Sequence, residues 1–276
     1  MVWSAYKVNR MISVDEIYSF FDIHYEKNFD FGGETHNFWE CVFVWEGEIC
    51  VTADQRVYNL AKNQIVFHKP MEHHKFRVTG SGATIVVISF SLSGALESCF
   101  ADKVFLLSSP QTEIMHSLLS YAKEKAGKTQ QLMEKYLCAA KEDRTYMQVI
   151  TTYLHRLFLS LAENETISEI SHAPDAALFG LAVDYMNSNV DKNPTVKEIS
   201  AFLNVSESGL KRIFFRYAGV GVHQYFVGLK MKAATQLLSH GISVSETAAR
   251  LGFSSQGYFS RVYKRETGTP PKLMKG

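Results

Sequence analysis

Two groups of side chains in this 276-residue sequence have types and spacings that could do chemistry. In the first third of the chain, His36 and Glu40 lie four residues apart, and His74 follows. Imidazole and carboxylate groups suit Fe, Mn or Zn, and they can also bind a polar small molecule. Near the C-terminus, Gln256 and Arg261 are side chains that can form paired hydrogen bonds with adenine and guanine edges in the DNA major groove. The sequence therefore contains one candidate small-molecule or metal site and one candidate nucleic-acid site.

The first candidate nucleic-acid segment covers residues 195–218. Thr195 and Glu198 have the spacing of a capping box and Ser206 is a good N-cap, so we expect two short helices separated by a tight turn. The second helix has an apolar face and a polar face. The apolar face holds Leu210, Ile213, Phe214 and Tyr217, and the opposite face holds Ser208, Lys211, Arg212, Phe215 and Arg216.

The same arrangement recurs after Ser243. The pattern predicts a helix from Ser243 to Leu251, a turn at Gly252, and a helix that begins at Ser254 or Ser255 and reaches about Glu266. The apolar face of that helix holds Phe259, Val262 and Tyr263, and its outer face offers Gln256, Gly257, Ser260, Arg261 and Lys264. A connecting helix from His223 to Ser239, about 25 Å long, can hold the two helix pairs about one turn of DNA apart.

The formal net charge of +1 conceals two opposed halves. Before Pro174 there are 16 basic and 21 acidic residues, and from Pro174 onward there are 13 basic and 7 acidic residues, so the halves carry −5 and +6. A compact basic domain indicates a nucleic-acid partner, although a solvated basic surface without a partner is the alternative.

The sequence gives no indication of a membrane protein or a secreted one. Its longest apolar runs, such as Ala83 to Phe90, are far shorter than the roughly 20 residues of a membrane helix, and the N-terminus lacks the pattern of a signal peptide. Four cysteines at wide spacings suggest buried free thiols rather than a disulfide framework. We therefore expect a cytoplasmic protein.

The hydrophobic pattern divides the chain into two domains. Short segments rich in Val, Ile, Phe and Thr from Phe38 to Phe90 predict an antiparallel β-unit, and helical spacing from Gln111 to about Asn164 predicts two or three helices, with a break at Gly127 and Lys128. Glu163 to Pro174 is polar and is a candidate linker. The expected fold class is α+β, with one domain over residues 1–165, a linker over 166–174, and an all-α domain over 175–276.

The C-terminal domain resembles the DNA-binding domain of the AraC family of bacterial transcription regulators. The resemblance rests on the segment from Glu246 to Pro271, which reads ETAARLGFSSQGYFSRVYKRETGTPP, and on Val205-Ser206 and Gly219 in the first half. It implies two tandem helix-turn-helix units on double-stranded DNA. The implied DNA-binding residues are Ser208, Lys211, Arg212 and Arg216 in the first unit and Gln256, Gly257, Ser260, Arg261 and Lys264 in the second.

Two qualifications limit what the resemblance implies. Phe215 stands where the family usually has Lys, which removes a possible phosphate contact. For Arg212 and Arg261, a phosphate contact or a surface salt bridge is the alternative to reading a base.

The N-terminal domain resembles the cupin-like β-barrel that precedes the DNA-binding domain in many AraC-family members. The resemblance rests on the spacing of His36 and Glu40 and on that of Pro70 and His74. It implies an effector site, for which His36, Trp39, Glu40 and His74 are the candidates. Trp39, with Phe43 and Trp45, also fits the barrel core, because strand alternation alone accounts for these residues. His68 and His73 are expected to be exposed turn residues.

Cupin enzymes use this pattern to hold a metal, but here Asn37 and Phe38 stand where a second His is usual. We therefore expect no metal, no cofactor and no enzymatic activity. The sequence predicts a sequence-specific transcription regulator controlled by a small-molecule effector. The helices before the linker are expected either to form a homodimer or to pack on the barrel, and RNA polymerase is a possible further partner. The alternatives are a cupin-type metalloenzyme tethered to DNA and a DNA-binding protein whose barrel only dimerises.

Overall fold

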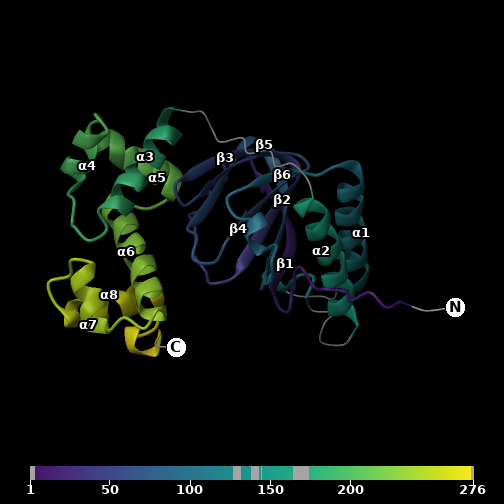
Figure 1. Cartoon of the computed structure of the whole chain (residues 1–276). Coiled ribbons are helices and arrows are strands. Elements are labelled where there is room, and N and C mark those ends of the chain that lie inside the picture. The colour runs from purple at the N-terminus through teal and green to yellow at the C-terminus, as the bar shows by residue number, and fades with distance from the viewer. Residues whose placement is uncertain (1–3, 127–131, 138–142, 144, 164–173, 275–276) are drawn as a thin grey trace. The chain divides into compact units, whose positions relative to one another are not determined.

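The computed structural model of the chain is an α+β structure, with an antiparallel sheet in its N-terminal part and helices in its C-terminal part (Figure 1). It describes residues 4–126, 132–137, 143, 145–163 and 174–274. The expected fold class is confirmed at this level. No helix within these residues has the length and apolar character that spanning a membrane requires.

The sheet has six strands in the order β1-β5-β2-β4-β6, and β3 pairs with β2. The strands are β1 (Ile17–Glu26), β2 (Trp39–Ala53), β3 (Arg56–Ala61), β4 (Gln64–His68), β5 (His74–Phe90) and β6 (Val104–Leu106). Four of them lie in the predicted segment, whereas β1 and β6 lie outside it. β1 is recognisable only through its long antiparallel pairing with β5, which is distant in sequence.

Side-chain alternation along the strands produces two apolar faces. On β2, Trp39, Cys41 and Phe43 belong to one hydrophobic cluster, whereas Val42 and Val44 belong to another. The first cluster also contains the buried faces of α1 (Ser109–Lys125) and α2 (Tyr146–Ala162), so these helices cover that side of the sheet (Figure 1). The short 3₁₀ segments of this part are Glu97–Cys99 and Leu132–Glu134.

Two predictions for the N-terminal part concern residues that the structure does not describe. The predicted helix break at Gly127 and Lys128 lies outside them, as does Cys138. Cys41 and Cys50 are buried free thiols and Cys99 is half-buried. Burial raises the pKa of the Cys41 thiol, because the thiolate would lose its hydration.

The C-terminal part consists of helices. They are α3 (Pro174–Ser188), α4 (Val196–Phe202), α5 (Glu207–Ala218), α6 (Val222–Ser239), α7 (Val244–Arg250) and α8 (Gln256–Thr267), followed by a 3₁₀ turn at Pro271–Met274. Pro174, the last residue of the predicted linker, is the first residue of α3, because proline fits the first turn of a helix. Residues 166–173 of the predicted linker lie outside the described part.

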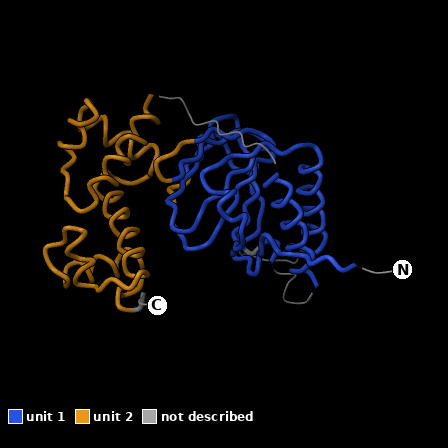
Figure 2. Tube along the Cα trace, viewed as in Figure 1, with its two compact units in different colours: residues 1–30, 35–53, 58–170 blue, residues 31–34, 54–57, 171–276 orange. Residues whose placement is uncertain are grey.

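The chain forms two compact units (Figure 2). One contains residues 1–30, 35–53 and 58–170, and the other contains residues 31–34, 54–57 and 171–276.

Candidate functional site

A row of polar side chains crosses one apolar face of the sheet. Ser19 on β1 is opposite Ser89 on β5, Ser89 is opposite Glu40 on β2, and Glu40 is opposite His68 on β4. All four are less than a tenth exposed. The Oγ atoms of Ser19 and Ser89 lie 2.6 Å apart, and the Ser89 hydroxyl donates a 2.7 Å hydrogen bond to Glu40. We call these four residues the polar row.

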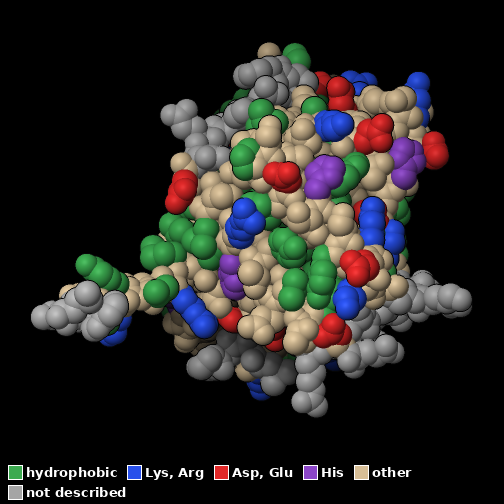
Figure 3. All heavy atoms as spheres, turned by 90° about the vertical axis from the view of Figure 1, so that its right-hand side faces the viewer, with side chains coloured by type: hydrophobic (Ala, Val, Ile, Leu, Met, Phe, Trp, Pro, Cys, Tyr) green, Lys and Arg blue, Asp and Glu red, His purple; other side chains and the backbone are tan. Residues whose placement is uncertain are grey.

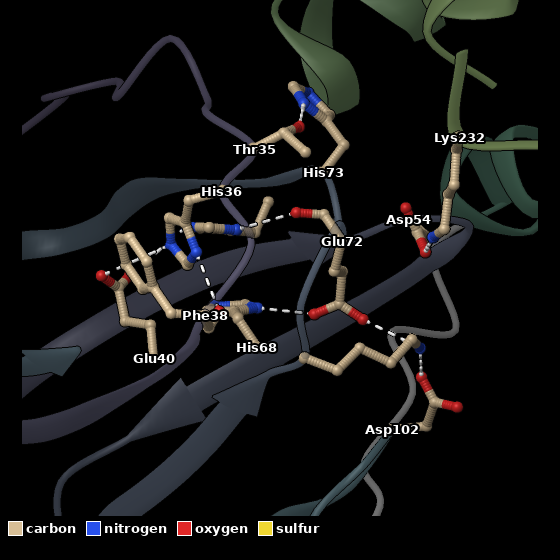
Figure 4. A network of polar contacts seen from close by, with 12 residues as sticks. Thr35, His36, Phe38, Glu40, Asp54, His68, Glu72, His73, Asp102 and Lys232 are labelled. Atoms are coloured by element: carbon tan, nitrogen blue, oxygen red, sulfur yellow. Dashed lines mark hydrogen bonds and ion pairs between the residues drawn. The ribbon is translucent and has the colours of Figure 1, made fainter. Parts of the chain in front are cut away.

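Three imidazole rings lie beside the carboxylate of the polar row (Figure 4). The ring of His74 stacks on His68 at a centroid distance of 4.2 Å and meets the edge of His36 at 4.8 Å. The Nε2 atoms of His74 and His36 lie 3.4 Å and 3.8 Å from oxygens of Glu40. Strand pairing places His68 opposite Glu40, and His36 and His74 lie beside the same buried glutamate.

A second buried carboxylate, that of Glu72, contacts His68 at one end of this cluster. His68 Nδ1 lies 2.8 Å from an oxygen of Glu72, whose other oxygen lies 3.1 Å from the ammonium of Lys69 (Figure 4). Lys69 also forms an ion pair with Asp102. These polar contacts extend from the buried imidazole of His68 to the partly exposed Asp102, and the ammonium of Lys69 stabilises a negative charge on Glu72.

The electrostatics keep the two carboxylates ionised. Burial alone would raise the pKa of Glu40, but contacts with His74, His68 and Ser89 outweigh it and lower the pKa. Burial likewise opposes the ionisation of Glu72, but His68 and Lys69 lower its pKa. Burial and then the charge of His74 lower the pKa of His68, so a neutral His68 donates its Nδ1 proton to Glu72. A buried carboxylate beside imidazole groups can receive a cation or hydrogen-bond donors.

The same residues are spaced closely enough to hold a metal ion. One ligand atom from each of His36, Glu40 and His74 lies within 4.8 Å of the others. Imidazole and carboxylate donors in this number fit a divalent transition metal. All three residues are among the candidates that the sequence offered.

The structure brings together His36, Glu40 and His74 but separates Trp39 from them. Trp39 is 4% exposed, lies in the cluster covered by α1 and α2, and donates its indole N–H to Glu97 at 3.1 Å. The reason is strand alternation, which points Trp39 and Glu40 to opposite faces of β2.

The expectation for His68 was wrong. It is the last residue of β4 and only 1% exposed, because it pairs across the sheet with Glu40. His73 is half-buried and lies 3.3 Å from the hydroxyl of Thr35. Sequence reasoning also missed Ser19, Ser89 and Glu72. The signal that could have found Glu40 and Ser89 together is that each is a polar residue in an otherwise apolar strand segment.

The second candidate site is built from α5 and α8, two helices of the same construction. Each has 12 residues, a serine N-cap whose hydroxyl accepts a backbone N–H, and a glycine C-cap with positive φ. The N-caps are Ser206 and Ser255, and the C-caps Gly219 and Gly268 have φ of 70° and 75°. Local capping therefore fixes both helices at the predicted positions.

The outer faces of α5 and α8 are exposed as the periodicity predicts. Leu210, Ile213, Phe214 and Tyr217 are buried on α5, and Phe259, Val262 and Tyr263 on α8. The candidate DNA-binding residues lie on the other side of each helix. Ser208, Lys211, Arg212, Arg216, Gln256, Gly257, Arg261 and Lys264 are exposed, and Ser260 is half-buried.

One of these basic residues is engaged within the protein. Arg216 forms an ion pair with Asp175 of α3 at 2.9 Å, and both side chains are exposed. Such a surface pair contributes little and can exchange for another anion. Within the described part of the chain, no ion pair involves Lys211, Arg212, Arg261 or Lys264.

A buried lysine supports the turn before α8. Lys230 of α6 is 3% exposed and donates hydrogen bonds to the carbonyl of Leu251 at 2.6 Å and to Asn193 at 2.8 Å. Its ammonium also lies 5.2 Å from the ring centroids of Phe226 and Phe253. Burial lowers the pKa of Lys230. This lysine therefore connects α6 to the end of α7 and orients the segment that leads into α8.

Comparisons with known proteins agree with this second site. A family model described as a helix-turn-helix domain matches residues 199–275. The chain is 26% identical over 251 residues to the HTH-type transcriptional regulator YfiF of Bacillus subtilis, covering 87% of this chain and 77% of that protein. It is 22% identical over 246 residues to the HTH-type transcriptional activator RhaR of Cronobacter sakazakii, covering 88% and 86%.

Two solved structures are also similar to the chain. ToxT from Vibrio cholerae O395 is similar over 93% of this chain and 98% of that chain, with a TM-score of 0.38 and 14% identity. An AraC-type DNA-binding-domain regulator from Chromobacterium violaceum is similar over 34% and 85%, with a TM-score of 0.33 and 28% identity. From the family model, the chain carries a helix-turn-helix domain in its C-terminal part, and the relatives that it resembles in sequence are HTH-type transcriptional regulators.

Proposed function

We propose that the protein binds specific DNA sequences through two helix-turn-helix units, α4 with α5 and α7 with α8, under the control of a small molecule bound by its N-terminal domain. The observation that supports two units is that α5 and α8 have the same length, a serine N-cap and a glycine C-cap. Both carry N-terminal polar residues and a basic outer face, which is how a recognition helix reaches base edges in the major groove. The helices before them, α4 and α7, each have seven residues.

The connection between the proposed units fits two successive major grooves. The 18-residue α6 leads from the first pair to the second. At 1.5 Å per residue it is about 27 Å long, near the roughly 34 Å of one DNA turn. We infer that each unit contacts one of two adjacent major-groove segments.

The test of this proposal is selection of bound fragments from the genome of the source organism, followed by affinity measurements at fixed salt. The full chain is expected to enrich sequences with two short conserved elements about one helical turn apart. Arg212→Ala and Arg261→Ala should each weaken binding at one element. Binding that is equal on selected and random DNA would contradict sequence-specific recognition.

For the N-terminal domain, we propose a cupin-like barrel whose effector site is formed by His36, Glu40 and His74. The support is the buried ionised Glu40 among imidazoles on an otherwise apolar face, since convergent polar groups in apolar surroundings typify ligand sites. Trp39 is left out of this site because it lies in the other hydrophobic cluster. The effector controls DNA binding only if it binds one functional state more tightly than another.

A thermal-shift screen against sugars and other metabolites tests the effector site. A ligand that binds the folded state raises the unfolding temperature of the intact chain. The shift should disappear in Glu40→Gln and persist in Glu46→Gln, which changes an exposed carboxylate of the same strand. A ligand whose shift survives Glu40→Gln would place the effector site elsewhere.

A second candidate function for this domain is metal binding, as in a cupin-type metalloenzyme tethered to DNA. It is favoured by the short distances among the ligand atoms of His36, Glu40 and His74. Elemental analysis of the purified chain tests it. Stoichiometric metal that is lost in His36→Ala but retained in His24→Ala, which changes an exposed histidine, would support metal binding.

We also propose that the chain forms a homodimer through α2, with a DNA-bound dimer presenting four helix-turn-helix units. On the side of the molecule shown in Figure 3, apolar side chains form separate groups among charged ones. Leu159 of α2 is 40% exposed. Light scattering of the wild type and Leu159→Glu tests this proposal, since a monomeric wild type would contradict it.

A further inference from the structure

One residue on the outer face of α5, Phe215, has no role in the proposed function. Phe215 is the ninth residue of α5, and Lys264 is the ninth residue of α8. The lysine can donate hydrogen bonds to a base or a phosphate, whereas the phenyl ring has no donor and no charge. The two helices therefore differ in chemistry at an equivalent position.

Phe215 occupies the centre of the outer face. With 3.6 residues per turn, its direction differs by about 20° from that of Ser208, and it falls between those of Lys211 and Arg212. The ring is 72% exposed, and the neighbouring buried residues Phe214 and Tyr217 point the other way. A ring at this place gains little from packing within the protein, but it would face the DNA if α5 enters the major groove.

The major groove offers one kind of apolar group on its floor. Base edges there present hydrogen-bond donors and acceptors, and thymine alone adds a C5-methyl group. The basic side chains around this ring attract the DNA backbone and so bring the ring close to the DNA. The ring itself has no group that can bind phosphate. The favourable contact that this ring can make in the groove is apolar packing against a methyl group.

We propose that Phe215 is a specificity-determining residue that packs against the C5-methyl group of a thymine in the element bound by α5. This inference rests on the proposed function, because it requires α5 to enter the major groove. It predicts a thymine requirement in the α5 element that has no counterpart at the equivalent place in the α8 element.

The experiment replaces thymine by deoxyuridine in a DNA site selected with the full chain. Deoxyuridine keeps every hydrogen-bonding group and lacks only the methyl group, so it isolates the proposed contact. At one or two positions in the α5 element, the substitution should weaken wild-type binding by about fourfold for each methyl group lost. Phe215→Ala should bind thymine and deoxyuridine DNA with equal affinity, close to that of the wild type on deoxyuridine DNA.

Two further variants test whether the sensitivity to deoxyuridine depends on the ring of Phe215. Phe202→Ala removes a ring of α4 that is also largely exposed, 60%, and should keep the wild-type sensitivity to deoxyuridine. Phe215→Lys copies α8 and should raise the affinity for all sequences while removing that sensitivity. Circular dichroism checks the folding of Phe215→Ala, which should melt like the wild type because the ring is exposed.

The outcomes separate this inference from the function on which it rests. A selected site at which no thymine of the α5 element responds to deoxyuridine overturns the role of Phe215 and leaves sequence-specific binding intact. Undiminished sensitivity in Phe215→Ala also overturns it. A selection that enriches no sequence at all overturns the proposed function, and this inference with it.

Discussion

The Nε2 atom of His74 lies 3.4 Å from a carboxylate oxygen of Glu40, and both side chains are buried on the same face of the sheet. The two residues are 34 positions apart in sequence, and the contact depends on the pairing of β2 with β4, which places Glu40 opposite His68, and on the stacking of His74 on His68. It places an ionised group on an otherwise apolar face of the sheet. The N-terminal site therefore has consequences for stability as well as for binding.

Removing the histidine from this pair should destabilise the N-terminal domain. We expect His74→Ala to lower the free energy of unfolding by about 2 kcal/mol, because it removes one partner of the buried carboxylate of Glu40 and leaves Ser89 as its hydrogen-bond donor. The cost should be smaller in a Glu40→Gln background, which removes the charge. Urea unfolding followed by tryptophan fluorescence measures this, since Trp3, Trp39 and Trp45, the three tryptophans of the chain, all lie in its N-terminal part. Equal costs in both backgrounds would contradict the coupling.

Asp22 should make the stability of the N-terminal domain sensitive to acid. Burial alone would raise its pKa, but hydrogen bonds from Lys135 at 2.5 Å, from Tyr136 at 2.5 Å and from Lys123 lower it to about 2. The pKa is lowered on folding, so the ionised carboxylate stabilises the fold above about pH 4, and this contribution is lost as the pH falls toward 2.

We therefore expect Asp22→Asn to lower the free energy of unfolding at neutral pH by about 1 kcal/mol, after allowance for solvent screening. The difference from the wild type should shrink between about pH 4 and pH 2. Fluorescence-monitored urea unfolding across this range checks it. Glu26→Gln, which changes an exposed carboxylate of the same strand, is the control. A difference that stays constant with pH would mean that the charge of Asp22 is not the cause.

The N-cap of α8 should be needed for the stability of the C-terminal helices. The hydroxyl of Ser255 accepts the backbone N–H of Tyr258 at 3.1 Å. Ser255→Ala should cost about 1 kcal/mol, because that N–H then lacks a partner in the helix. Thermal unfolding followed by circular dichroism, together with hydrogen exchange at Tyr258, measures the loss. Ser254→Ala, next to it in the turn, should change the stability by less than about 0.5 kcal/mol.

Arg261 should discriminate between DNA sequences. If it reads a base, Arg261→Ala costs about 1–3 kcal/mol on the selected site and much less on random DNA. Arg265, whose guanidinium pairs with Glu266 at 2.6 Å, provides the matched control for removal of a positive charge from the same helix. Fluorescence anisotropy on both DNAs at several salt concentrations makes the comparison. Equal losses on selected and random DNA would assign Arg261 to phosphate.

Sequence patterns located the C-terminal helices closely because their signals are local. The N-caps Thr195, Ser206, Ser243 and Ser255 and the C-cap Gly219 act within one helical turn of themselves, so the residues that end each helix are adjacent in the sequence. The exposed faces followed from the 3.6-residue period. The charge of +6 from Pro174 onward likewise needed only counting.

The N-terminal site depends on strand pairing over long distances in the chain. His36, Glu40 and His74 could be proposed from spacing, but Ser19, Ser89 and His68 join Glu40 only through the register of four strands that are distant in sequence. The same register reverses two expectations, since it buries His68 and turns Trp39 to the opposite face. Helix positions and their exposed faces were thus readable from the residues alone, because capping and helical period act over a few residues. The set of polar groups that meet inside the sheet emerged only from the folded arrangement, because a shift of one residue in strand pairing would move every side chain to the other face.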